Sequence, residues 1–251
     1  MTVYFIGAGP GAADLITVRG QRLLRSCQVC LYAGSIMPDD LLAECPPDAR
    51  VVDTGPLNLE QIIGELVAAH EAGLDVARLH SGDPSIYSAV AEQCRRLDEL
   101  GIDYEIVPGV AAFAAAAAAL GRELTVPGVA QTITLSRVAT LSTAMPEGED
   151  LVSLSKPGAT LVLHLAAAQI DNIVPQLLEG GYSPETPCAV VAFVSWPTEQ
   201  LVTCPLAELA ERTKAAGITK TAVIFVGDAL GAQGFTESYL YSSGRRRGAT
   251  H

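Results

Sequence analysis

Three short glycine-bearing segments are the residues of this chain best suited to bind a small molecule. They are GAGPG at Gly7–Gly11, SGDP at Ser81–Pro84 and PGV at Pro108–Val110. Each follows a short apolar run typical of a buried strand: VYFI, VARLH and YEIV. Ligands of an open parallel sheet bind outside the carboxyl ends of its strands, and glycine lets the main chain approach a ligand closely. We therefore expect one site, built largely from backbone atoms.

The first of these segments matches the looser dinucleotide fingerprint G-x-G-x-x-A, because Ala12 follows Gly11. Two features weaken the nucleotide interpretation. The second expected strand runs into Tyr32-Ala33-Gly34, with no acid to bind a ribose hydroxyl, and Pro10 lacks a backbone donor that could face a pyrophosphate. A nicotinamide or flavin oxidoreductase stays as a lower-ranked alternative. The chain contains neither a P-loop nor a G-x-S-x-G nucleophile elbow.

Alternating strands and helices must position these segments, and they predict a parallel α/β sheet in the first half of the chain. The strands expected there are Val3–Ile6, Gln28–Tyr32, Val51–Asp53, Val76–His80 and Tyr104–Val107, with helices near Thr17–Arg25, Asp39–Ala43, Leu59–Ala72, Tyr87–Leu100 and Ala111–Leu120. The pattern changes after Gly121, and Thr140–Pro157 has no clear period, which predicts a long surface loop there. We expect an N-terminal domain over 1–118, a mixed-sheet α/β domain over 119–243, a basic tail over 244–251, and a ligand cleft between the domains.

Composition narrows the class of protein. The chain has 251 residues, of which 49% are hydrophobic, and a formal net charge of −12. Nucleic-acid binders usually carry a basic stripe, whereas the basic cluster here is Arg245–Arg247, so we expect no nucleic-acid partner. No apolar stretch reaches the roughly 20 residues that span a bilayer, and no basic segment precedes the first strand. We expect a cytoplasmic protein without a membrane partner.

The cysteines and histidines do not have the spacing of metal ligands in the sequence. Cys27 and Cys30 form a C-x-x-C, but no second pair follows at ligand spacing. The pair overlaps an expected apolar strand, so we interpret it as buried and structural, and expect no metal site. His80 and His164 lie in apolar strands, where core histidines are commoner than ligands.

The whole set of segments, in order, resembles the tetrapyrrole (corrin/porphyrin) methylase family, which uses S-adenosyl-L-methionine. The matching stretches are residues 3–20, 78–87, 104–127 and 219–230. Within the family, residues 123–137, 145–151 and 195–202 are most similar to the branch that methylates carbon 11 of a corrin precursor in cobalamin synthesis. The uroporphyrinogen branch carries an acid after the second strand, and Tyr32-Ala33-Gly34 departs from that pattern. The resemblance therefore disfavours uroporphyrinogen as the substrate.

The resemblance implies two α/β domains, a homodimer, and S-adenosyl-L-methionine bound between the domains, with S-adenosyl-L-homocysteine as product. By family pattern, the cofactor contacts fall on Pro10, Ser81, Gly82, Asp83, Ile86, Ala111, Ala112, Leu165, Val194, Thr221 and Ala222. For Asp83, capping of a following helix is the alternative role.

The substrate implied by the resemblance is a polycarboxylate tetrapyrrole. Arginine suits carboxylate capture, so Arg122 and Arg137 are candidates, with Tyr87 and Trp196 as walls of the site. Methyl transfer depends mainly on alignment, and the sequence identifies no catalytic acid or base. Alternatives are a methylase of the same fold acting on another tetrapyrrole, on RNA or on protein, and a non-catalytic metabolite sensor.

Overall fold

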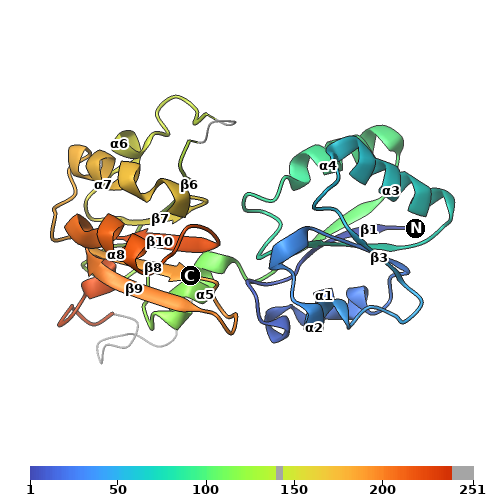
Figure 1. The fold of residues 1–251 in the computed structure, drawn as a ribbon, viewed down its shortest axis with the longest axis horizontal. Helices are drawn as coiled ribbons and strands as arrows, with labels where there is room; N and C mark the ends of the chain where they lie inside the picture. The colour runs from blue at the N-terminus through green and yellow to red at the C-terminus, as the bar shows by residue number, and fades with distance from the viewer. Residues whose placement is uncertain (140–143, 239–251) are drawn as a thin grey trace, which may run out of the picture. The chain divides into compact units, whose positions relative to one another are not determined.

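The computed structural model describes residues 1–139 and 144–238, and these form two compact units (Figure 1). The first unit consists of Met1–Ala115 together with the short segment Val194–Pro197. The second consists of residues 116–193 and the described residues from Thr198 onward. The expected basic tail, residues 244–251, lies outside the described part of the chain.

The first unit contains a five-stranded parallel sheet, as the alternation of strands and helices predicts. Its strands are β1 (Val3–Gly7), β2 (Val29–Tyr32), β3 (Arg50–Asp53), β4 (Val76–His80) and β5 (Tyr104–Val107), in the order β3-β2-β4-β1-β5. Every pair is parallel. The three strands that precede the glycine segments, β4, β1 and β5, are therefore neighbours, and their carboxyl ends share one edge.

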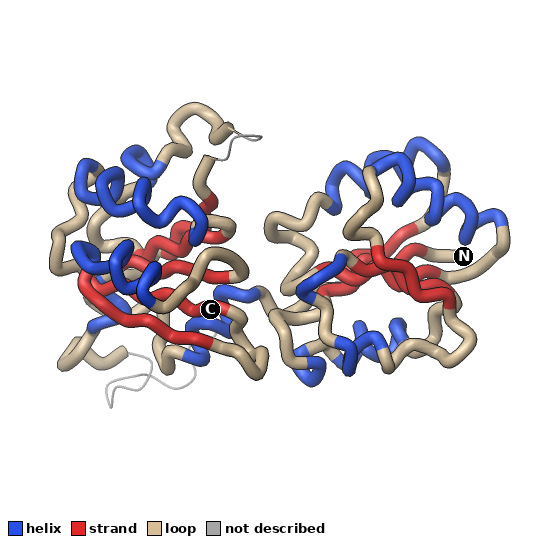
Figure 2. Tube along the Cα trace, in the orientation of Figure 1, coloured by secondary structure: helices blue, strands red, loops and turns tan. Residues whose placement is uncertain are grey.

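Helices cover both faces of this sheet (Figure 2). They are α1 (Val18–Leu24), α2 (Asp39–Leu42), α3 (Leu59–Glu71) and α4 (Val90–Leu100). Side chains of a strand alternate between faces, so Phe5 packs in the cluster formed with α3 and α4, whereas Ile6 packs in the cluster formed with α1 and α2. A parallel sheet buried on both faces holds the strand ends in fixed positions.

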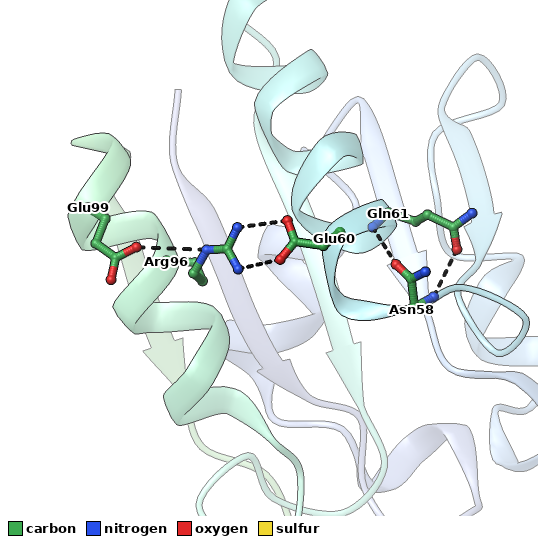
Figure 3. Close-up of polar contacts among 5 residues, drawn as sticks. All are labelled: Asn58, Glu60, Gln61, Arg96 and Glu99. Atoms are coloured by element: carbon green, nitrogen blue, oxygen red, sulfur yellow. Dashed lines mark hydrogen bonds and ion pairs between the residues drawn. The ribbon is translucent and has the colours of Figure 1, made fainter.

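Polar contacts at the surface fix the start of α3 and join it to α4 (Figure 3). Asn58 caps α3 by accepting a hydrogen bond from the Gln61 amide (3.0 Å), and the Gln61 side chain accepts one from the Asn58 amide (2.9 Å). Arg96 of α4 binds both carboxylate oxygens of Glu60 and lies 3.8 Å from Glu99. Because these ion pairs are exposed, we expect them to add little stability.

The second unit contains a mixed sheet. Its strands are β6 (Ile133–Arg137), β7 (Thr160–His164), β8 (Pro187–Ala192), β9 (Gln200–Pro205) and β10 (Ala222–Val226), in the order β6-β7-β10-β8-β9. The β6–β7 pair is parallel and the other pairs are antiparallel. The helices are α5 (Ala112–Ala119), which begins in the first unit, α6 (Leu151–Leu154), α7 (Ile170–Glu179) and α8 (Leu209–Ala215). The largest core cluster lies between this sheet and helices α7 and α8.

Two local expectations differ from the structure. Helix α4 begins at Val90 instead of Tyr87, because Tyr87 and Ala89 both have φ of 52°, which a right-handed helix does not accept. The region near 140–157, expected as an irregular loop, contains the short helix α6, which Asp150 caps by accepting a hydrogen bond from the Ser153 amide (2.9 Å). Within the described residues, no helix combines the length and apolar character needed to cross a membrane.

Candidate functional site

The three glycine segments meet at the carboxyl edge of the first sheet, as predicted. The segments after β1 and β4 form an antiparallel bridge, in which Gly82 donates to the Gly9 carbonyl (2.7 Å) and Gly9 donates to the Gly82 carbonyl (3.2 Å). The Ala8 amide also donates to the His80 carbonyl (2.8 Å). These bonds set the path of the main chain just beyond the strands.

Close backbone contact explains why glycine stands at the centre of this edge. A Cβ atom at Gly109 would lie 2.2 Å from the Gly82 carbonyl oxygen, and one at Gly7 would lie 2.5 Å from the Gly109 Cα. Such separations are far below van der Waals contact. Gly82 adds a positive φ of 68° and packs against the backbone of Ala111 and Ala112. The three segments are thus packed backbone against backbone, with no room for side chains between Gly7 and Gly109.

Asp83 ties two of the segments together. One carboxylate oxygen accepts a hydrogen bond from the Gly109 amide (2.7 Å), and the other accepts from the Ser85 amide (2.8 Å) and hydroxyl. Partial burial alone would raise the pKa of this carboxyl, but the hydrogen bonds outweigh it and leave the pKa below its usual value. The carboxylate is therefore charged at neutral pH, and it shapes the loop that carries Ile86 and Tyr87.

The Pro10–Gly11 turn is held by a segment distant in sequence. The Trp196 indole donates to the Pro10 carbonyl (3.3 Å), and the Ser195 hydroxyl accepts from the Ala12 amide (2.9 Å). A Cβ at Gly11 would lie 2.4 Å from a Trp196 ring carbon, so the ring fills the space of a side chain. Trp196, predicted to border the substrate, thus supports the first glycine segment. Val194, two residues earlier in the sequence, is buried.

His80 is buried at the end of β4, directly before Ser81. Its ring lies 5.8 Å from the Phe5 ring, and its Nε2 has no hydrogen-bond partner among the described residues. Burial, and then the positive charge of Arg78, lower the pKa of His80 to about 3, although a hydrogen bond with the Ser88 backbone opposes them. The imidazole is therefore neutral, which fits a core role better than a role in proton transfer.

In the second unit, the remaining cofactor candidates gather at one end of the mixed sheet. Thr221 and Ala222 lie where β10 begins, and Leu165 directly follows β7, its antiparallel neighbour. The Thr221 carbonyl accepts a hydrogen bond from Phe193, which directly follows β8. This end of the sheet therefore brings together residues 165, 193 and 221–222.

Backbone strain is concentrated at the candidate residues and their neighbours. In the described parts of the chain, the non-glycine residues with positive φ are Tyr87, Ala89, Leu165, Phe193, Ser195 and Thr221. Three of them, Tyr87, Leu165 and Thr221, were predicted as site residues, and Phe193 and Ser195 flank Val194. Such conformations cost roughly 1–3 kcal/mol each and cluster at binding sites. Phe193 and Ser195 were missed because no glycine or charge marks them in the sequence.

The two predicted arginines lie at different ends of the second unit's sheet. Arg137 ends β6 in register with His164, so it is next to Leu165, and its guanidinium donates to the carbonyls of Val138 (3.2 Å) and Ala144 (3.1 Å). It lines a cavity of about 400 Å³. Arg122 is exposed and lines another cavity, of about 480 Å³, where β8 begins and β9 ends. The structure therefore places Arg137, and not Arg122, beside the strained residues.

The described residues contain no group of three or more His, Cys, Asp or Glu side chains placed to hold a metal ion. The six cysteines are free thiols. The glycine segments lie at the carboxyl ends of β1, β4 and β5, where open parallel sheets bind small molecules.

Comparison with known proteins supports this picture. Residues 2–210 match the family described as Tetrapyrrole (Corrin/Porphyrin) Methylases. The precorrin-4 C(11)-methyltransferase of Mycobacterium tuberculosis is 74% identical over 245 residues, which cover 98% of each chain.

Two solved structures share the fold. A cobalt precorrin-4 methyltransferase superposes with a TM-score of 0.89 at 40% identity, covering 91% of this chain and 95% of that one. The uroporphyrin-III C-methyl transferase of Thermus thermophilus, complexed with S-adenosyl homocysteine, gives 0.76 at 28% identity, covering 92% and 93%. With most of its length matched in each comparison, this chain belongs to the tetrapyrrole methylase family.

Proposed function

We propose that this chain is an S-adenosyl-L-methionine-dependent methyltransferase that methylates carbon 11 of precorrin-4 in cobalamin biosynthesis. The observation that carries the proposal is the 74% identity, over nearly the whole of both chains, to a relative of that name. The glycine-lined edge of the first sheet supports it, because a related structure with a similar fold is complexed with S-adenosyl homocysteine.

The residues at the two sheet edges fit this cofactor. Gly7 and Gly109 pack backbone against backbone where added Cβ atoms would collide, and Gly82 has a positive φ, so the segments that carry the proposed contacts are held close together. The cofactor's sulfur loses its positive charge during the reaction, so a site built mainly from main-chain atoms, with the Asp83 carboxylate beside them, suits this ligand. The proposed contacts are Pro10, Ser81, Gly82, Asp83, Ile86, Ala111, Ala112 and Val194 from the first unit, and Leu165, Thr221 and Ala222 from the second.

The chain's own contribution is positioning. When bound, S-adenosyl-L-methionine supplies a methyl group on a sulfonium. The protein must hold that methyl group in line with the reacting carbon and keep water out, and alignment of this kind lowers a barrier by roughly 7–11 kcal/mol in favourable cases. Arg137 is proposed to bind a substrate carboxylate, Tyr87 and Trp196 to border the substrate, and Arg122 to bind a more distant carboxylate.

The remaining expectations are part of the same proposal. The chain works as an N-terminal domain over 1–118 and a C-terminal domain over 119–243. It acts as a cytoplasmic homodimer, without nucleic-acid or membrane partners, and residues 244–251 form an appended basic tail.

Calorimetric titration tests the cofactor first. We expect S-adenosyl-L-homocysteine to bind with a micromolar or lower Kd, and NAD(P) to give no heat. Binding of NAD(P) alone would refute the methylase and support the dinucleotide interpretation. Incubation with precorrin-4 and methyl-deuterated cofactor should then add one labelled methyl group at carbon 11, as read by mass spectrometry and NMR.

The same assay separates metal-free from cobalt-bearing substrate. The 74% identical relative is named for precorrin-4, whereas the cobalt precorrin-4 methyltransferase structure is 40% identical. We therefore expect a higher kcat/KM for metal-free precorrin-4 than for its cobalt complex. The reverse order would reassign the substrate without changing the reaction.

A further inference from the structure

Two cysteines of the second unit stand directly opposite each other on neighbouring antiparallel strands. Cys188 of β8 is in register with Cys204 of β9. The nucleotide-like and methylase interpretations of the sequence leave both residues without a role, and both are free thiols in the structure.

The hydrogen-bond ladder defines which kind of pair this is. Leu206 donates to the Thr186 carbonyl (2.9 Å), so 186 and 206 form a hydrogen-bonded pair. Pairs of the two kinds alternate along an antiparallel ladder. Pro187 and Pro205, which have no amide hydrogen, therefore occupy a non-hydrogen-bonded pair, and Cys188 and Cys204 the next hydrogen-bonded one. Cα atoms in such pairs are about 5.5 Å apart, inside the range that disulfides span.

The two side chains also share one face of the sheet. Cys188 is buried in the core cluster beneath α7 and α8, and Cys204 packs against the same cluster. Cys204 is partly exposed and lies on β9, the edge strand. Cys204 is therefore the more accessible of the two residues, and Cys188 is its direct cross-strand neighbour.

We propose that Cys188 and Cys204 form a reversible dithiol–disulfide site, oxidised by small-molecule disulfides. The Cys204 thiolate attacks the disulfide RSSR, which forms a mixed disulfide and releases one RS⁻. The Cys188 thiolate then attacks the Cys204 sulfur, which forms the Cys188–Cys204 bond and releases the second RS⁻. The cysteines lose two electrons to RSSR, and their two protons pass to the released thiolates.

The local environment makes this exchange slow and easily reversed. Burial raises the pKa of both thiols, and Glu208 raises that of Cys204 further, whereas Arg212 lowers it. Only a small fraction is thiolate at neutral pH, and exchange requires the thiolate. Cβ atoms of opposed residues lie about 4.5–5.5 Å apart and are further apart in hydrogen-bonded pairs, so this pair must move closer by roughly 1 Å to form a disulfide, and strained disulfides are more reducible.

Peptide mapping of the folded protein tests the site directly. The protein is incubated with glutathione disulfide, alkylated, and cleaved after glutamate. Cleavage at Glu185, Glu199 and Glu208 separates the two cysteines into peptides 186–199 and 200–208. We expect these peptides to stay joined until dithiothreitol is added, and to separate in Cys204→Ser. Cys45→Ser is the matched control, since it removes a cysteine of the other unit and should leave the link intact.

Recovery of the two peptides separately alkylated, or of Cys204 carrying only glutathione, would overturn the proposal. So would a link confined to Cys27, Cys30 and Cys45, which lie in one core cluster of the first unit. A second measurement uses the unfolding midpoint. A bridge between β8 and the edge strand restricts the unfolded chain, so oxidation should raise the midpoint by a few degrees in the parent protein and leave it unchanged in Cys204→Ser.

Discussion

The candidate residues lie at two places: at the carboxyl edge of the parallel sheet, where its strands end, and at the end of the mixed sheet where β10 begins. The backbone is shaped in a different way at each place. At the edge of the parallel sheet, Gly7 and Gly109 bring chain segments into a contact that side chains would prevent, and Gly82 has a positive φ. At the end of the mixed sheet, Leu165, Phe193 and Thr221 adopt left-handed conformations without being glycine. One edge removes side chains, whereas the other keeps them and accepts strain.

The two edges are therefore held rigid by different interactions. The first edge lies over a parallel sheet that is covered on both faces, and hydrogen bonds such as that from Gly109 to Asp83 hold it. At the second edge, the surrounding structure must hold Leu165, Phe193 and Thr221 in conformations that cost roughly 1–3 kcal/mol each. We therefore expect substitutions at the first edge to block ligand binding through steric collision. Substitutions that relieve strain at the second edge should raise the free energy of unfolding and weaken ligand binding.

Gly109→Ala should have the largest effect. The new Cβ would lie 2.2 Å from the Gly82 carbonyl oxygen and 2.7 Å from the Gly7 Cα, so two backbone segments must move apart. A displacement of about 1 Å in a binding site costs on the order of a hundredfold in rate. We expect at least that loss in kcat/KM, and a similar loss of S-adenosyl-L-homocysteine affinity by calorimetry.

Gly64→Ala is the matched control. Gly64 lies within α3, and a Cβ there meets no atom within 4 Å. Alanine is favoured over glycine in helices by about 1 kcal/mol, so this variant should be slightly more stable and fully active. If Gly109→Ala also retained activity and affinity, the three-segment contact would not be part of the site.

Acid should destabilise the protein through His80, which stands behind the first edge. Its pKa is lowered to about 3 in the folded state, whereas in the unfolded chain it is about 6.5. The unfolded chain thus binds a proton first, and stability falls as the pH drops from about 6.5 toward 3. One group contributes about 1 kcal/mol per pH unit. Urea unfolding between pH 7 and pH 4 measures this slope.

His80→Phe should flatten the slope, because phenylalanine keeps the contact with Phe5 and has no proton to bind. His164, whose pKa burial also lowers, should leave part of the slope in place. An unchanged slope in His80→Phe would show that the acid sensitivity has another origin.

The same contrast explains how much the sequence could predict. Strands and glycine segments of the first unit follow from local signals, because apolar runs and glycine are visible residue by residue. The second α/β domain was expected from the change of pattern after Gly121, whereas the grouping of Leu165, Thr221 and Ala222 in one site came from family resemblance. The positive φ values of Phe193 and Ser195, and the contact of Trp196 with Pro10, depend on segments far apart in sequence, so no local pattern could reveal them.

Arg137 and Arg122 test whether the strained end of the second sheet is the substrate side. Arg137 lies beside Leu165, whereas Arg122 lies at the other end of the sheet. We expect Arg137→Met to raise the KM for the tetrapyrrole about tenfold, as loss of a charged hydrogen bond does, with little change in S-adenosyl-L-homocysteine affinity. Arg122→Met should change KM less. An equal or larger effect at Arg122 would move the substrate to that end.

Leu165→Gly should have the smallest effect, and it should raise stability while it weakens cofactor binding. Leu165 has φ of 54° and is 64% exposed, so glycine relieves strain and loses little packing. Strain relief, reduced by the flexibility of glycine, should raise the free energy of unfolding by about 1 kcal/mol, while the looser backbone weakens cofactor binding about threefold. Leu201→Gly is the matched control, because Leu201 is exposed in β9 without a positive φ and should lose stability. If both variants lost stability and bound the cofactor normally, the left-handed residues would be ordinary turns, and the second edge would no longer differ from the first.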